Sequence, residues 1–316
     1  MRLARWLVLS LLAAPAIGAE RGELSVFAVV DVGRAPHQIA FDRAGTTAYI
    51  AAPGSGWIAV VDVDSLEVTK HVPAASYPMG VVPLPSGDLL VSRFRSFRVA
   101  RLDPNDGRVI QTLSTGAGPS LFTTMPGDRW LVTAAKANRL WVVDGKAFSL
   151  VGPYETGRRP FHASATSDGK LAFVPAHEDG SVTVVDLEHG VVRSTVHVGD
   201  KPTGGVVLPG DKEYALTLAG ENRLVFIDTA TDRVVHSIED GIGEAPFYVD
   251  VTPSGSLLFT ANTRSHDISV VDLDEKRVVQ RLSVGAVPVV VAVHPSGDTL
   301  WVASEGSHTV SVIRLP

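Results

Sequence analysis

The sequence predicts an all-β fold, a β-propeller of seven four-stranded blades, and three observations support this prediction. A proline recurs every 41 to 44 residues, at positions 36, 78, 119, 160, 202, 246 and 288. An aspartate recurs in the same phase, at positions 62, 103, 144, 186, 228 and 272. Each unit also holds short apolar runs separated by turns, without helical periodicity. A repeat with four short strands per unit is typical of propeller blades. We number the blades by the proline, from blade one at Pro36 to blade seven at Pro288.

The last unit, residues 285–315, shows the expected elements of a blade most clearly. An apolar run at Val289–Val293 predicts the inner strand, and a turn at 294–298 follows it. Thr299–Ala303 predicts the second strand and Val310–Leu315 the third, with a polar loop between them. In the other units a fourth, outer strand comes next, for example Val191–Val198 or Val278–Val284. The recurring aspartate follows the third strand, where its carboxylate is expected to accept hydrogen bonds from backbone amides of the turn.

The seventh unit ends at Pro316 after only three strands. An apolar segment at Leu24–Val30 precedes the first repeat proline and has the character of an outer strand. We therefore expect it to complete blade seven and close the ring, which removes the open edges of a linear array of sheets. Residues 20–316 are then one domain without a linker.

Residues 1–19 have the features of a secretory signal peptide. Arg2 and Arg5 give a positive start, Trp6–Ala14 is a short apolar run, and small residues follow. Cleavage after Gly18 and cleavage after Ala19 both fit the pattern. The apolar run is shorter than the roughly 20 residues of a transmembrane helix. No second stretch approaches that length, so we expect a periplasmic or secreted protein with no membrane span after removal of the signal.

Composition restricts the classes of partner and of chemistry. Without residues 1–19 the chain holds 26 basic and 34 acidic side chains, so neither nucleic-acid nor anionic-membrane binding is expected. The chain has no cysteine, which excludes disulfides, a thiol nucleophile and a thiolate metal site. It also contains no HExxH, GxGxxG or P-loop motif, so no metal-binding or catalytic residue is assigned and the cofactor is left unknown.

The predicted second strands share a pattern that resembles a known family. They read AYIAA, LLVSR, WLVTA, AFVPA, YALTL, LFTAN and LWVAS, and the third strands commonly end in VVD or FID. This resembles the YVTN-repeat family of seven-bladed propellers, with Phe259–Asn262 nearest to the name motif. The resemblance covers nearly all of residues 20–316 and implies the fold. It implies no single function, because similar propellers include exported binding proteins and relatives of lactonases and haem d1 domains.

The repeats serve as an internal alignment that separates structural from unusual residues. His266 and His308 occupy the loop position of Asn138 and Asn222, so we interpret them as turn residues. Most other histidines fall in outer strands or turns. Those that remain lie beside a repeat proline or in a loop on the same face, near the mouth of the central channel, and are His37, His162 and His177.

Blade two carries the unusual sequence RFRSFR at residues 93–98. Arg98 shares its repeat position with Arg139 and Arg223 and is interpreted as part of the scaffold. Arg93 and Arg95 have no counterpart of this kind, so they are either anion-recognition residues or part of an exposed loop.

Blade four supplies the densest ionisable cluster of the chain, with Arg158-Arg159-Pro160-Phe161-His162 and His177-Glu178-Asp179. The predicted ligand-binding residues are those expected to meet on one face: His37, Arg93, Arg95, Arg159, His162, His177 and Glu178.

Three functions are consistent with these residues. The first is an exported, non-enzymatic propeller that binds a small anionic ligand or a protein partner in the funnel at its mouth. The second is a lactonase-like hydrolase, because Pro160-Phe161-His162 is similar to the Pro-Arg-His segment of those enzymes, although Phe161 replaces the arginine. The third is tetrapyrrole binding as in haem d1-type propellers, with His37 or His162 as axial ligand. Those domains have eight blades, whereas this chain has seven proline positions.

Overall fold

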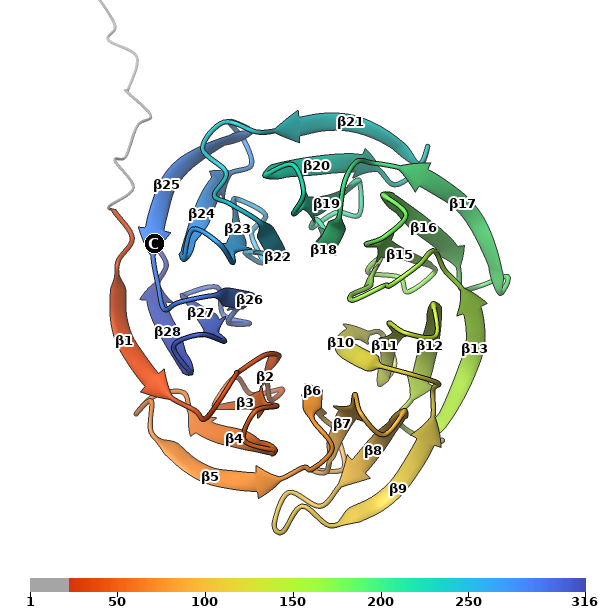
Figure 1. The fold of residues 1–316 in the computed structure, drawn as a ribbon, viewed down its shortest axis with the longest axis vertical. Coiled ribbons are helices and arrows are strands. Elements are labelled where there is room, and N and C mark those ends of the chain that lie inside the picture. Colours follow the sequence, from red (N-terminus) through yellow and green to blue (C-terminus); the bar gives the residue numbers. More distant parts are fainter. Residues whose placement is uncertain (1–22) are drawn as a thin grey trace, which may run out of the picture.

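The computed structural model describes residues 23–316, which form seven four-stranded antiparallel sheets arranged in a ring (Figure 1). We use the word channel for the centre of this ring, inside the inner strands. The predicted all-β, seven-bladed propeller is confirmed. The signal peptide expected at 1–19 lies outside the described residues. Among residues 23–316 the structure contains no helix of the length and apolarity needed to cross a bilayer.

Blades one to six run from the channel outwards through four strands in sequence order, and blade seven takes its outer strand from the beginning of the propeller. The inner strands are β2 (Ile39–Phe41), β6 (Pro78–Pro83), β10 (Pro119–Met125), β14 (Ser164–Ala165), β18 (Pro202–Val207), β22 (Pro246–Val251) and β26 (Pro288–Val293). The second strands are β3 (Thr47–Ala52), β7 (Leu89–Arg93), β11 (Arg129–Ala134), β15 (Leu171–Ala176), β19 (Glu213–Leu218), β23 (Leu257–Asn262) and β27 (Thr299–Ser304).

The outer half of each blade is built in the same way. The third strands are β4 (Trp57–Asp62), β8 (Arg98–Leu102), β12 (Arg139–Asp144), β16 (Ser181–Asp186), β20 (Arg223–Asp228), β24 (Asp267–Asp272) and β28 (Thr309–Arg314). The outer strands are β5 (Val68–Pro73), β9 (Val109–Ser114), β13 (Ser149–Glu155), β17 (Val191–His197), β21 (Arg233–Ile238), β25 (Arg277–Ser283) and β1 (Val26–Asp31). The second and third strands are almost entirely buried, and the core lies between neighbouring sheets.

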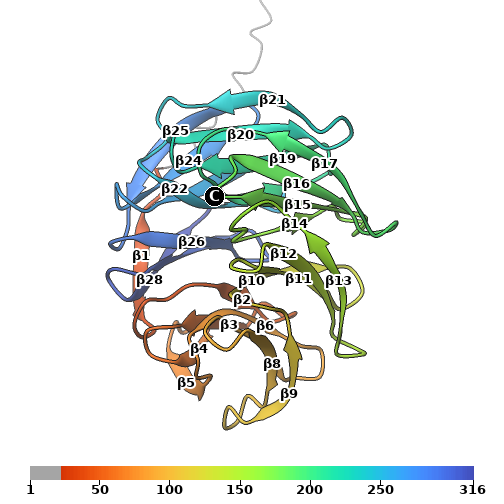
Figure 2. The same cartoon turned by 45° about the vertical axis from the view of Figure 1, so that its right-hand side comes forward.

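The ring closes as the sequence predicts. Strand β1 pairs antiparallel with β28 and completes the sheet β1-β28-β27-β26 (Figures 1 and 2). The strand begins at Val26, two residues later than expected. Leu24 lies before it, where the Gln280 side chain of blade six donates to its carbonyl at 2.7 Å and accepts from its amide at 2.9 Å. Leu24 and strand β1 therefore contact blade six and blade seven, respectively.

The recurring aspartate has the predicted role in the turn after the third strand of blades one to six. Asp62 accepts from the amide of Ser65 at 2.8 Å, Asp144 from that of Ala147 at 2.7 Å, and the aspartates of the other units make equivalent bonds. These amide bonds favour the ionised carboxylate, so they lower the pKa of Asp62.

Two glycines in inner strands let a side chain of one blade reach past the next blade. The buried Gln38 of blade one donates to the carbonyl of Phe122 in blade three at 2.6 Å and accepts from its amide at 2.9 Å. It passes Gly80 of blade two, where a Cβ atom would lie 2.7 Å from its Oε1 atom. Gly204 of blade five leaves similar room beside Tyr248 of blade six, since a Cβ there would lie 2.7 Å from the Tyr248 Cα atom. Side chains thus link alternate blades across the channel wall.

Candidate functional site

The repeat prolines lie at one mouth of the channel, which we call the proline face. On this face the loop after the second strand lies beside the segment before the inner strand of the same blade. The amide of Lys136 donates to the carbonyl of Ala117 at 3.1 Å, and the amide of Glu178 to that of Arg158 at 3.2 Å. The two groups of loops that carry most of the predicted site residues therefore share one face.

The residue before each repeat proline has a left-handed backbone, with φ between 52° and 75° in all seven blades. In four blades its amide donates to a side chain of the preceding blade. Asn138 accepts from Arg159 at 3.0 Å, and His266 accepts through Nδ1 from Val287 at 3.0 Å. Asn222 and His308 make the same contact with Ala245 and Ala35 at 2.8 and 3.3 Å. These contacts support the interpretation of His266 and His308 as structural residues.

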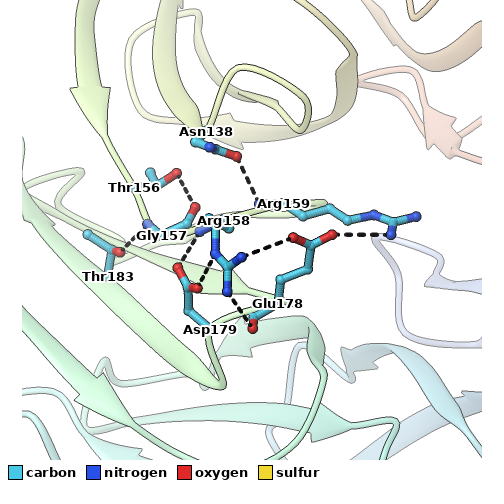
Figure 3. Close-up of polar contacts among 8 residues, drawn as sticks. All are labelled: Asn138, Thr156, Gly157, Arg158, Arg159, Glu178, Asp179 and Thr183. Atoms are coloured by element: carbon cyan, nitrogen blue, oxygen red, sulfur yellow. Dashed lines mark hydrogen bonds and ion pairs between the residues drawn. The ribbon is translucent and has the colours of Figure 1, made fainter.

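A cavity of about 420 Å³ opens on the proline face between blades two, three and four. Phe94 comes from RFRSFR in blade two, Lys136 from blade three, and Arg159 and Glu178 from blade four (Figure 3 shows the last two). The complete lining is Phe94, Ala135, Lys136, Asn138, Arg158, Arg159, Phe161 and Glu178. Of the seven predicted ligand-binding residues, Arg159 and Glu178 line this cavity.

The carboxylates near the cavity neutralise Arg158 more completely than they neutralise Arg159 or Lys136. The Nε atom of Arg158 donates to Asp179 at 2.6 Å, and its backbone amide donates to the same carboxylate at 2.6 Å (Figure 3). These bonds lower the pKa of Asp179 and keep it ionised. Arg159 makes only a long contact with Glu178, at 3.5 Å. This leaves Arg159 able to bind another anion.

Lys136 is the cation of the cavity without a carboxylate partner among the described residues. Its Nζ atom lies 5.1 Å from the centre of the Phe94 ring, and the Arg159 guanidinium lies 5.2 Å from that of Phe161. Each free or weakly paired cation thus rests against an aromatic ring. Lys136 was not among the predicted residues. Its repeat position is that of Arg95 in blade two, and comparison of these two loops would have identified it.

Arg93 and Arg95 flank Phe94 but are absent from the cavity lining. The Nη2 atom of Arg93 donates to the Ser76 hydroxyl at 3.1 Å, and its Nε atom is buried without a hydrogen-bond partner in residues 23–316. The guanidinium of Arg95 stacks over the Tyr77 ring at 4.4 Å. Both arginines therefore contact the segment before Pro78, in which three successive residues, 75–77, have φ values of 44°, 53° and 64°.

The three predicted histidines lie in different environments. His177 is half-buried and packs edge-on against Phe161, with ring centres 5.4 Å apart. Burial, and then the charge of Arg159, lower its pKa. It therefore packs against Phe161, which lines the cavity, without lining the cavity itself.

His162 lies deeper, in the channel wall, and is only 5% exposed. Its Nε2 atom lies 3.0 Å from the Thr123 hydroxyl of blade three and 2.9 Å from the Tyr248 hydroxyl of blade six. Burial lowers the pKa of His162 to about 4, so the ring is neutral at pH 7. This ring links blades three, four and six.

His37 lies at the boundary with blade seven and is 8% exposed. Its Nε2 atom is 3.8 Å from Glu305, beyond hydrogen-bond distance, and its buried Nδ1 atom has no hydrogen-bond partner in the described chain. Burial lowers the pKa of His37 to about 4. The structure therefore brings Arg159, His177 and Glu178 together, but places His37 and His162 in other surroundings. Within residues 23–316 no three His, Asp or Glu side chains are grouped to hold a metal ion.

Comparisons with known proteins extend the description of the fold. No protein-family model matches the chain. Protein NirF of Stutzerimonas stutzeri is 22% identical over 270 residues, which are 77% of this chain and 68% of that protein. A chain of Kuenenia stuttgartiensis hydrazine synthase superposes with a TM-score of 0.80 at 20% identity, covering 89% of this chain and 96% of that one. The chain is thus similar over most of its length to both proteins, and at these identities the shared feature is the propeller fold.

Proposed function

We propose that this chain is an exported propeller of the YVTN-repeat type that binds a small anionic ligand, without turnover, in the cavity on its proline face. The observation that carries the proposal is the excess of positive charge in that cavity. Lys136, Arg158 and Arg159 face it, while Arg158 is largely neutralised by Asp179. The guanidinium of Arg159 and the ammonium of Lys136 can both donate to a carboxylate or phosphate.

The aromatic walls indicate the shape of the ligand. Phe94 and Phe161 both line the cavity, and each also contacts a cation. A flat anion such as an aromatic carboxylate can place its ring against phenylalanine and its charge against Lys136 or Arg159. A volume of about 420 Å³ lies within the range of small-molecule sites. A rigid ring of blades holds the three loops in place, which reduces the entropic cost of binding.

The test is titration calorimetry with benzoate, phthalate and inorganic phosphate. Lys136→Met and Arg159→Met should each weaken the binding of phthalate by about tenfold or more, because a hydrogen bond to a charged group contributes about 1.5–3 kcal/mol. Lys146→Met is the matched control, since Lys146 is an exposed lysine of the same blade outside the cavity. Equal affinity in all four proteins would refute the proposal. If none of the three probes binds, the proposal of a small anionic ligand is wrong and a protein partner becomes the candidate.

A lactonase-like mechanism finds less support in the geometry. It requires a histidine base beside an anion-binding guanidinium. Phe161 occupies the position of that arginine, and the Nε2 atom of His162 already contacts Thr123 and Tyr248. We therefore do not assign a hydrolytic role to these residues.

Tetrapyrrole binding is a second candidate, for which one observation is specific. His162 is engaged through Nε2, whereas neither ring nitrogen of His37 makes a hydrogen bond with the described residues. The Nδ1 atom of His162 also has no hydrogen-bond partner in the described residues, but both nitrogens of His37 are free, so His37 is the preferred axial ligand. Arginines would hold the carboxylates of the group. A tetrapyrrole would supply a coloured, redox-active centre. A visible absorption band in the purified protein that is lost in His37→Ala would support this candidate, and a colourless protein would exclude it.

A further inference from the structure

A second cavity, of about 260 Å³, lies on the opposite face, where four inner strands end in their hairpin turns. Its lining comes from blades four to seven and shares no residue with the cavity on the proline face. The polar side chains in the lining are Ser167, Asp211, Asp250, Thr252 and His294. Two carboxylates thus face this cavity, and no lysine or arginine of the described chain lines it.

Asp250 is unusual for its place in the repeat. The equivalent positions in the other blades hold Ala40, Val82, Thr123, Ser164, Val206 and Ala292. None of these six side chains is ionisable, so the carboxylate is peculiar to blade six. A property of one blade alone is not required by the repeat.

The hydrogen bonds of Asp250 do not require its charge. One oxygen accepts from the amide of Val293 in blade seven at 2.8 Å, and the other from Val251 at 2.8 Å. In blade four the neutral Ser164 hydroxyl accepts from the amide of Val207 in blade five at 3.0 Å, which is the same contact between blades. A serine would therefore satisfy the structural role.

The ionised form of Asp250 is unfavourable in free energy at this position. Burial raises the pKa of Asp250 to about 6, because no cation offsets the loss of water around the ionised form. Asp211 adds a second carboxylate, held by the amide and hydroxyl of Ser167. The ring of His294 is fixed by Ser296 and by the carbonyl of Gly45.

The remaining lining is apolar and rigid. The rings of Pro209, Pro253 and Pro295 contribute to it, together with valine side chains at the ends of the inner strands. An occupant of this cavity must therefore combine a small positive group with an aliphatic part.

We propose that this cavity of blades four to seven, on the face opposite the proline face, binds a small alkylammonium ion. The ammonium group donates to Asp250 and the alkyl chain lies against the proline rings. This site is separate from the anion site and does not depend on it.

The test is calorimetric titration of butylamine, as its ammonium form, into the wild type and into Asp250→Ser. The variant keeps an acceptor for the Val293 amide, as Ser164 does for Val207, but has no charge. We expect at least a tenfold loss of affinity in the variant, with a melting temperature equal to or above that of the wild type. Asp64→Ser, at an exposed aspartate of blade one, should bind butylamine as the wild type does.

Two results would overturn the proposal: a wild type that does not bind butylamine, or an Asp250→Ser variant that binds it equally well. If Asp250→Ser does not fold, Asp250→Asn replaces it, because an amide oxygen also accepts from the Val293 amide. A melting temperature of Asp250→Ser equal to or above that of the wild type distinguishes loss of the amine site from general damage, whether or not the proline face binds phthalate.

Discussion

Replacement of His162 by alanine tests whether this histidine holds the channel wall together. In the structure its Nε2 atom lies within hydrogen-bond distance of Thr123 in blade three and of Tyr248 in blade six. Alanine removes both contacts and leaves a space among buried side chains. Thr123 keeps its bond to the carbonyl of Ala163, so Tyr248 is the group that loses its partner.

The expected cost follows from these contacts. A hydroxyl left without a partner costs about 1–3 kcal/mol, and the lost ring packing adds to this, so we expect about 3 kcal/mol at pH 7. The pKa of His162 is about 4 in the folded protein against 6.5 for the unperturbed group. Folding therefore favours the neutral ring, and this contribution is complete above pH 6.5 and is lost as the pH falls towards 4. Each pKa unit corresponds to about 1.4 kcal/mol, so the unfolding free energy of the wild type falls by about 3 kcal/mol through this group between these two pH values.

Urea unfolding of wild type and His162→Ala at pH 7 and pH 4.5 measures both quantities. The difference in unfolding free energy should be about 3 kcal/mol at pH 7 and below about 1 kcal/mol at pH 4.5. His197→Ala is the control, because His197 is exposed on an outer strand and should change stability by less than about 0.5 kcal/mol. A loss below about 1 kcal/mol at pH 7, or a difference that does not depend on pH, would refute the assigned role.

Three further changes have definite expected results. Glu178→Gln should raise phthalate affinity by about threefold to tenfold in calorimetry, because it removes the carboxylate that competes for Arg159; an unchanged or lower affinity would argue against Arg159 as a ligand. Phe97→Asn should raise the unfolding free energy by about 0.5–1 kcal/mol, since Phe97 is 51% exposed at a φ of 61° that asparagine tolerates better, and a lower melting temperature would contradict this. Gln38→Ala should lower the unfolding free energy by about 2–4 kcal/mol in urea unfolding, because the amide and carbonyl of Phe122 lose a buried partner. Gln111→Ala, at an exposed glutamine, should have little effect.

The fold could be predicted from the sequence because each blade repeats one physical pattern. The proline, the turn aspartate and the apolar runs recur in phase, so an error in one blade is corrected by the others. The closure by β1 followed from a count of strands, since blade seven lacked one. The start of β1 was misplaced by two residues because Leu24 is as apolar as the strand, although it packs against blade six through Gln280.

The candidate site could be predicted less completely, because its contacts run between blades. The repeat register places Arg93, Arg159 and His177 on one face, but the side chains that meet there depend on how neighbouring blades pack. The position of Phe94 against Lys136 is such a contact. Comparison of the repeats does not reveal this contact, because the two residues belong to different blades.

The buried position of His162 could not be predicted for a similar reason. Its contact with Tyr248 of blade six passes blade five, where Gly204 leaves room for Tyr248. Sequence position alone gave His162 the same place at the channel mouth as its neighbour Phe161. Only Phe161 lines the cavity.

The most direct test of the account is titration of phthalate into the wild type and into the double variant Lys136→Met/Arg159→Met. Both cations face the cavity on the proline face, and neither is fully neutralised by the carboxylates there. The account predicts one phthalate per wild-type chain and at least a hundredfold lower affinity in the double variant, with an unchanged melting temperature. A wild type that releases no heat of binding, or a double variant that binds as tightly, would contradict it.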